Sequence, residues 1–223
     1  MAVDLVPLPP SFASTRVSLH ALAEHVLAPL RYRDERRIGL RPLDGGFGPP
    51  LPDRRVAVVG AALHDDGRTA DITTLAAAAT FLGVDLGAPV EVYTPATDGD
   101  PDRPQDVDAD ASHALGGWFA FGEALLADLA GHAGSADDPT EIQLWPEHFD
   151  LALSVGAEGA RVNLGVSPGD ADHDEPYLYV GPWEPRSGPL WNESWGASLG
   201  YEAIRSGADP TTFVEERRRA LGD

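Results

Sequence analysis

Apolar positions recur along this chain at two spacings, one typical of helices and the other of strands. Residues 14–30 repeat apolar positions every three or four residues, which predicts a helix capped by Ser14 or Thr15. Residues 112–132 carry a second helical stripe, formed by Leu115, Trp118, Phe121, Leu125 and Leu129. We expect shorter helices after Thr73 or Thr74, over 193–205, and over 211–221 with Asp209 as the N-cap.

Short apolar and β-branched runs predict the strands. In the first half these runs cover 55–63, 68–72 and 89–94, and the first two are joined by a turn at Asp65-Asp66-Gly67. In the second half they cover 141–145, 149–155, 161–166 and 177–183. Because strands follow strands without a regular βαβ alternation, we expect an α+β fold with a largely antiparallel sheet and helices packed on one face.

The length of the chain sets the expected domain organisation. Its 223 residues lie within the range of one domain, so we predict a single globular domain over 1–223. Pro7, Pro9 and Pro10 make residues 1–12 an extended proline-rich arm. The same prolines break any signal-peptide pattern, and no apolar run reaches the roughly 18 residues of a membrane span. We therefore expect a cytoplasmic protein.

The charge of the chain limits the classes of binding partner that we expect. The formal net charge is −20, which argues against nucleic acid and against anionic membrane surfaces as partners. Cysteine is absent, so disulfides and thiolate chemistry are excluded. All 16 basic residues are arginine, and we expect the local group formed by Arg31, Arg33, Arg36, Arg37 and Arg41 to pair with carboxylates of the same chain.

The second half of the chain carries the residues of most chemical interest. If Leu151 and Leu153 point into the core, the alternation of a strand sends Asp150 to the opposite face, and it does the same for the polar and aromatic residues of the next two strands. Pockets combine aromatic walls with a few polar groups. The pattern predicts a small-molecule site on this face, lined by His148, Asp150, Asn163, Asp170, Tyr177, Tyr179 and Trp183.

Other interpretations of this segment stay open. Imidazole and carboxylate groups also hold divalent metals, so His148, Asp150 and Asp170 are candidate ligands for a divalent metal cofactor, with His173 as a further one. A metal-dependent hydrolase would need such a site, although the spacing matches no zinc motif. The same face could instead be a solvated sheet surface, or the contact surface of a non-catalytic protein-interaction domain. The oligomeric state is not predicted.

Three further motifs favour structural roles. Gly196-Ala-Ser-Leu-Gly200 fits a nucleophile elbow, but no histidine follows it, so we interpret its glycines as part of a closely packed helix. The acidic runs at 98–102 and 170–174 lack the glycine and glutamate of a calcium loop. His20 and Glu24 are four residues apart, and we expect them to form a solvent-exposed pair.

Several segments together resemble a family of actinobacterial proteins without an assigned activity. The resemblance rests on Leu144–Leu151, Ser167–Asp170 and Glu175–Tyr179, and on Ile38–Leu40, Gly45–Gly48 and Thr73–Leu75. It covers most of the chain. The resemblance implies an actinobacterial host and the extent of the domain, and it implies no catalytic residues.

Overall fold

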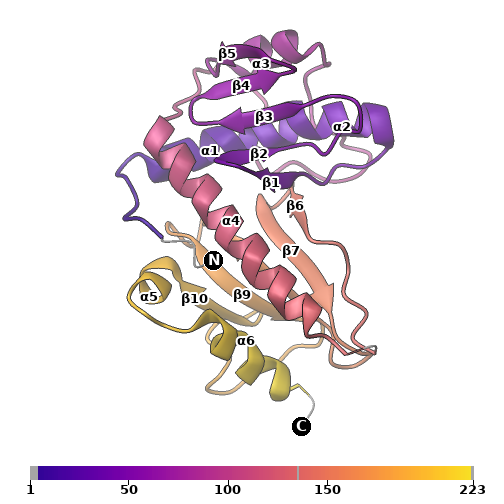
Figure 1. Ribbon diagram of the computed structural model, residues 1–223, viewed down its shortest axis with the longest axis vertical. Helices are drawn as coiled ribbons and strands as arrows, with labels where there is room; N and C mark the ends of the chain where they lie inside the picture. Colours follow the sequence, from indigo (N-terminus) through magenta and orange to yellow (C-terminus); the bar gives the residue numbers. More distant parts are fainter. Residues whose placement is uncertain (1–4, 135, 222–223) are drawn as a thin grey trace. The chain divides into compact units, whose positions relative to one another are not determined.

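The computed structural model describes residues 5–134 and 136–221, and these divide into two units (Figure 1). The first unit takes in the chain up to Ala120 together with Leu144–Phe149. The second takes in Phe121–Gln143 and the chain from Asp150 onward. Residues 1–4 of the predicted arm lie outside the described residues, and residues 5–9 have no regular structure. The prediction of one domain over 1–223 stays a prediction.

The α+β class is confirmed, and the strands form two antiparallel sheets. The first sheet has the order β1-β2-β3-β4-β5, with bounds Arg41–Leu43, Gly46–Gly48, Val56–Val59, Ala62–Asp65 and Arg68–Asp71. The second has the order β10-β9-β8-β7-β6, and its strands in chain order are Gln143–Trp145, Asp150–Val155, Val162–Ser167, Tyr177–Pro182 and Ala197–Gly200. In both sheets, strands that follow one another in the sequence are also adjacent in the sheet. Short connections therefore suffice to join most of these antiparallel pairs.

Helices supply the remaining core surface. They are α1 (Phe12–Leu22), a π-helical segment η1 (Ala23–Leu27), α2 (Ala28–Glu35), α3 (Leu75–Leu82), α4 (Ala109–Gly131), α5 (Tyr201–Arg205) and α6 (Pro210–Arg219). In the first unit, Phe47, Phe119 and Phe149 meet edge to face with ring centroids 5.3–6.2 Å apart. In the second unit, the part of α4 after Ala120 packs on the sheet, where a Cβ on Gly122 would lie 2.2 Å from a methyl carbon of Val166. No helix of the described ranges is long and apolar enough to cross a membrane.

The starts of α3 and α6 agree with the caps that the sequence predicts. Thr74 caps α3 by accepting a hydrogen bond from the Ala77 N–H at 3.1 Å, and Gly83 ends that helix in a left-handed conformation. Asp209 caps α6 in the same way, and Pro210 is its first residue. The predicted cap of the first helix is wrong, because α1 begins one turn earlier, after Ser11.

Three predicted elements are also wrong. The run 55–63 is two strands, because Gly60 adopts a positive φ of 57° and turns the chain between β3 and β4. Residues 89–94 contain no strand, and residues 90–92 form a turn in which the Val92 N–H donates to the Pro89 carbonyl at 2.8 Å. Residues 193–200 are not helical. They form a tight turn and then β10, and only Tyr201–Arg205 is a helix.

Hydrogen bonds to the π-helical segment hold the chain on both sides of residues 89–94, which the sequence predicts as a strand. Pro29 has no N–H to donate to the His25 carbonyl, and that carbonyl accepts a hydrogen bond from the Gly87 N–H at 3.0 Å instead. The Glu24 carboxylate accepts hydrogen bonds from Ala96 N–H at 2.9 Å and from Thr97 N–H at 2.8 Å. The segment that follows α3 is therefore held against the first helix. Glu24 is fully buried, which corrects the prediction that it forms an exposed pair with His20.

Candidate functional site

Alternate residues of the second sheet form a polar face. Leu151 lies opposite Val166, and the apolar residues of this parity are buried. The other parity carries polar and aromatic side chains, with Tyr177 opposite Ser167 and Tyr179 opposite Gly165. The register therefore places four of the predicted site residues on one face, as the alternation indicates: Asp150, Asn163, Tyr177 and Tyr179.

Tyr179 reaches across the sheet to Asp150. Its hydroxyl, on β9, donates a hydrogen bond to the carboxylate of Asp150 on β7. The strand between them carries Gly165, where a Cβ would lie only 2.5–2.7 Å from the Tyr179 ring and hydroxyl. The glycine therefore leaves the space in which the ring lies. Burial and the nearby Asp150 raise the pKa of Tyr179 well above its ordinary value, so the hydroxyl keeps its proton and stays a donor.

A chain of polar contacts continues from the neighbouring tyrosine. The Tyr177 hydroxyl donates to Asp170 at 2.6 Å, and the other Asp170 oxygen lies 3.4 Å from His173 Nδ1. On its far side, His173 Nε2 lies 3.1 Å from Glu193 Oε1. The Ser198 hydroxyl donates to that same oxygen at 2.6 Å. We call Asp170, His173, Glu193 and Ser198 the imidazole–carboxylate network.

The protonation of this network follows from its geometry. Burial by itself lowers the pKa of His173, but the hydrogen bond to Glu193 and the charge of Asp170 outweigh it and raise the pKa above its ordinary value. A hydrogen bond from Ser198 lowers the pKa of Glu193 against the opposing effect of burial. Burial would raise the pKa of Asp170, but hydrogen bonds from Tyr177 and two backbone N–H groups lower it. The network therefore favours an imidazolium held between two carboxylates.

Aromatic rings border the network. The His173 ring lies 4.6 Å from the ring of Tyr177, centroid to centroid. Trp195 lies 6.2 Å from Tyr177 and 6.0 Å from Tyr179, edge to face with the second. Trp195 keeps 42% of its surface exposed, whereas Tyr177 keeps 8%. The indole is therefore the accessible part of this aromatic group.

Asn163 and Trp183 form a separate group on the same sheet. The Trp183 indole N–H donates to the Asn163 side-chain oxygen at 2.9 Å, and Ser154 donates to that oxygen at 2.7 Å. The Arg161 guanidinium lies 5.4 Å from the centre of the Trp183 ring. Ser167, the residue of β8 that pairs with Tyr177, lies four residues from Asn163. In a strand this spacing separates the two Cα atoms by about 13 Å. Among the predicted site residues of the second unit, Asn163 and Trp183 therefore form one group, and Asp150, Asp170, Tyr177 and Tyr179 form another.

His148 belongs to the first unit and is exposed, whereas Asp150 and Asp170 belong to the second. Within the ranges that the structure describes, no three or more His, Asp or Glu side chains form a group that could hold a metal ion. The candidate ligands Asp150 and Asp170 instead each accept a hydrogen bond from a tyrosine. The metal site and the metal-dependent hydrolase stay predictions.

Sequence reasoning missed Glu193, Trp195 and Ser198 as neighbours of the polar face. The sequence pattern predicts a helix over 193–205, which would turn these side chains to different sides. The turn at 193–196, closed by hydrogen bonds between Glu193 and Gly196, is the feature that brings the segment back along β9. The Gly196–Gly200 motif was the one sequence signal that pointed to Ser198.

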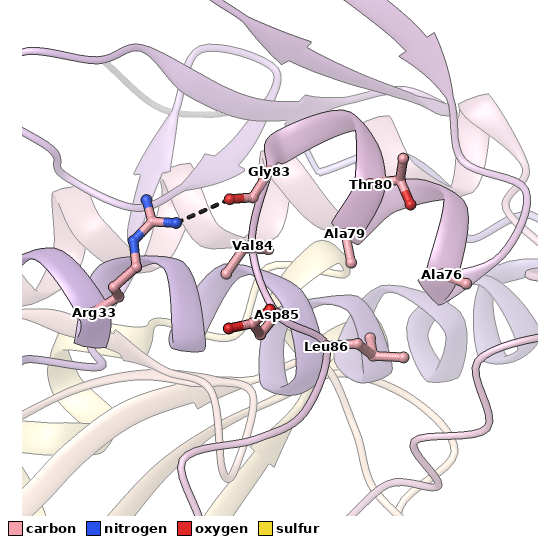
Figure 2. A pocket seen from close by; sticks show the side chains of 8 residues that line it. All are labelled: Arg33, Ala76, Ala79, Thr80, Gly83, Val84, Asp85 and Leu86. Atoms are coloured by element: carbon pink, nitrogen blue, oxygen red, sulfur yellow. Dashed lines mark hydrogen bonds between the residues drawn. The ribbon is translucent and has the colours of Figure 1, made fainter.

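A hollow in the first unit has fewer charged and aromatic side chains in its lining than the polar face of the second sheet. Its volume is about 470 Å³, and it lies beside α3 and the residues that follow it (Figure 2). Figure 2 shows Arg33 reaching from α2 to the Gly83 carbonyl, with a hydrogen bond of 2.9 Å. Arg33 is also paired with Asp34 at 2.7 Å. The rest of the lining is mostly small, namely Ala76, Ala79, Thr80, Val84, Asp85 and Leu86.

Comparison with known proteins adds no assignment to this geometry. The resemblance to an actinobacterial family therefore stays a prediction. No protein-family model matches the chain, and neither the curated proteins nor the solved structures contain a significant match to it.

Proposed function

We propose that the protein binds a small polar organic molecule on the polar face of its second sheet, beside Trp195. The observation that carries the proposal is the position of this accessible indole against the ring of Tyr177, whose hydroxyl donates to Asp170, one of the two carboxylates that share the His173 imidazole. Ligand sites in proteins combine such an aromatic surface with a few oriented polar groups. The proposed site keeps Asp150, Asp170, Tyr177 and Tyr179 from the predicted set and adds the network residues and Trp195.

The contacts favour binding over nucleophilic catalysis. A serine nucleophile needs a neutral base in hydrogen-bond contact with its hydroxyl. Ser198 donates instead to Glu193, a carboxylate whose pKa is lowered, and His173 faces a carboxylate at each ring nitrogen. Both arrangements hold charges in place and support an oriented binding surface.

The chemistry of the surface indicates the kind of ligand. Asp170 already accepts hydrogen bonds from Tyr177 and from two backbone N–H groups, so the acceptor that the network offers to a ligand is Glu193, of which only Oε1 has a hydrogen-bond partner among the described residues. A complementary ligand carries hydroxyl or amino donors. It also has an apolar face that can lie on the Trp195 ring, as sugars and organic amines do. The chain's net charge of −20 favours the amines further.

An NMR titration tests the proposal. The probes are neutral monosaccharides and simple mono- and diamines, and the signal followed is the indole N–H of each tryptophan. We expect a binding probe to shift the Trp195 signal. We expect Trp195→Ala, which lacks this reporter and is titrated by calorimetry beside the wild-type protein, to bind the probe at least about tenfold more weakly, equivalent to about 1.4 kcal/mol.

Trp183→Ala is the matched control, because Trp183 is 62% exposed and contacts Arg161 and Asn163 rather than the network. The control should change the affinity by less than about twofold. Absence of binding by every probe, or equal weakening in both tryptophan variants, would contradict the proposal.

A further inference from the structure

A groove of about 940 Å³ lies on the first unit, and none of the residues that line it belongs to the proposed site. Its floor is one face of the first sheet, to which Leu43, Ala57 and His64 belong by their register. Residues 49–55 connect β2 to β3 and supply one wall, which includes Pro49, Leu51 and Pro52. The volume lies in the upper part of the range of small-molecule sites, about 300–1,000 Å³.

Strand alternation assigns the arginines of this groove to opposite sides. Arg54 and Arg55 are consecutive, so their side chains leave the chain in opposite directions. Arg54 makes two hydrogen bonds to the buried Asp65, at 2.7 and 2.9 Å, on the core side of the sheet. Arg55 therefore shares the groove side with Ala57, two residues further along the chain.

Arg41 approaches the same region from β1. It pairs with Gly48, and the register of β2 with β3 continues from Gly48 to Ala57. With strands about 4.8 Å apart and a rise of about 3.3 Å per residue, the Cα atoms of Arg41 and Arg55 are about 12 Å apart. Two arginine side chains can span that distance and hold one anion between them.

Both guanidinium groups are available. Within residues 5–134 and 136–221, neither Arg41 nor Arg55 uses its guanidinium in an ion pair, a side-chain hydrogen bond or a ring contact. This distinguishes Arg41 from Arg31, which pairs with Glu35 at 3.0 Å as the sequence predicts. The chain as a whole has a net charge of −20. Two available positive groups on one groove therefore contrast with the negative charge of the rest of the chain.

The other charged groups of the lining leave room for an anion. Asp66 lies opposite Arg55, and its carboxylate accepts a hydrogen bond from the Arg55 backbone N–H at 2.9 Å. Asp53 is exposed on the connecting segment. His64 Nδ1 lies 3.2 Å from the Thr69 hydroxyl, and when that hydroxyl donates, Nε2 carries the proton and can donate to a ligand.

We propose that this groove binds a small organic anion, with its carboxylate or phosphate group between Arg41 and Arg55. The apolar part of the ligand lies along Leu43, Leu51 and the two prolines. Arginine suits both head groups because its planar donors match their oxygen pairs.

Calorimetric titration at low ionic strength tests this inference with benzoate and phenyl phosphate as probes and benzyl alcohol as the neutral counterpart. We expect at least one anion to bind and benzyl alcohol to bind at least about tenfold more weakly. The double variant Arg41→Gln, Arg55→Gln should weaken the anion at least about tenfold. The double variant Arg36→Gln, Arg205→Gln changes the net charge equally outside the groove and should have less than about a twofold effect.

The two anions distinguish the ligand classes. Preference for benzoate assigns a carboxylate ligand, and preference for phenyl phosphate assigns a phosphate ester. Failure of both anions to bind overturns the inference, as does equal weakening in the two double variants or equal affinity for benzyl alcohol. Thermal unfolding of each variant, followed by circular dichroism, verifies that the affinities compare folded proteins.

Discussion

The Tyr179 hydroxyl donates a hydrogen bond to the buried carboxylate of Asp150 from two strands away, over the bare backbone of Gly165. The contact joins β7 to β9 by a side chain, in addition to the backbone ladders through β8. It also fixes the ring that the exposed indole of Trp195 meets edge to face. Asp150, Tyr179 and Trp195 therefore connect the stability of the sheet to the shape of the proposed site.

Removal of the Tyr179 hydroxyl should destabilise the protein. Tyr179→Phe keeps the ring and takes one donor from a buried carboxylate, which costs about 1–3 kcal/mol. Chemical denaturation measures the change in the free energy of unfolding. Tyr32→Phe is the control, because Tyr32 is partly exposed and its ring contact is with Arg36, so it should change little. Equal effects of the two substitutions would contradict this assignment.

The space above Gly165 should be intolerant of one methyl group. Gly165→Ala places a Cβ 2.5–2.7 Å from Tyr179 and must displace the ring, at a cost of about 1–3 kcal/mol. Gly181→Ala is a matched control on the same sheet face, because its nearest neighbours are atoms of Asn163 at 3.8 and 3.9 Å. Denaturation midpoints of the two variants should differ clearly, and matching midpoints would contradict the packing argument.

His173 should make stability depend on pH. Its pKa is raised in the folded protein above the ordinary value of 6.5, so the folded state binds the proton more tightly than the unfolded state. The stabilisation is complete below 6.5 and is lost as the pH rises through the folded-state pKa. Unfolding free energies at several pH values should therefore decline over this interval.

The decline of the unfolding free energy with rising pH should be smaller in His173→Gln than in the wild-type protein. His132→Gln is the control, because the side chain of His132 is 79% exposed. It should leave the decline intact. A direct NMR titration of the His173 ring that gives a pKa below 6.5 would refute the assignment.

Glu24 should be essential for the segment that it holds. Glu24→Gln replaces one acceptor oxygen by an NH₂ group that faces backbone donors, so we expect a loss of about 1–3 kcal/mol. Amide exchange at Ala96 and Thr97 should also accelerate. The exposed Glu91 provides the control, since Glu91→Gln should alter neither quantity. Unchanged protection of both amides in Glu24→Gln would argue against the role of this carboxylate.

The sequence by itself determined the features that depend on near neighbours in the chain. The alternation over 150–155 and 162–167 assigned side chains to faces, because a strand has a period of two whatever it packs against. Thr74 and Asp209 marked helix starts, because capping joins residues two or three apart. The α+β class and the antiparallel pairing followed from the same local signals.

Tertiary structure alone decided where those elements meet. Glu24 has the spacing of an exposed pair with His20, and it is buried because residues some 70 positions away donate to it. Residues 197–200 have no strong strand pattern, and pairing with β9 makes them a strand. The imidazole–carboxylate network likewise joins His173 to Glu193, 20 positions apart. Such contacts depend on the packing of distant segments, which no window of neighbouring residues contains.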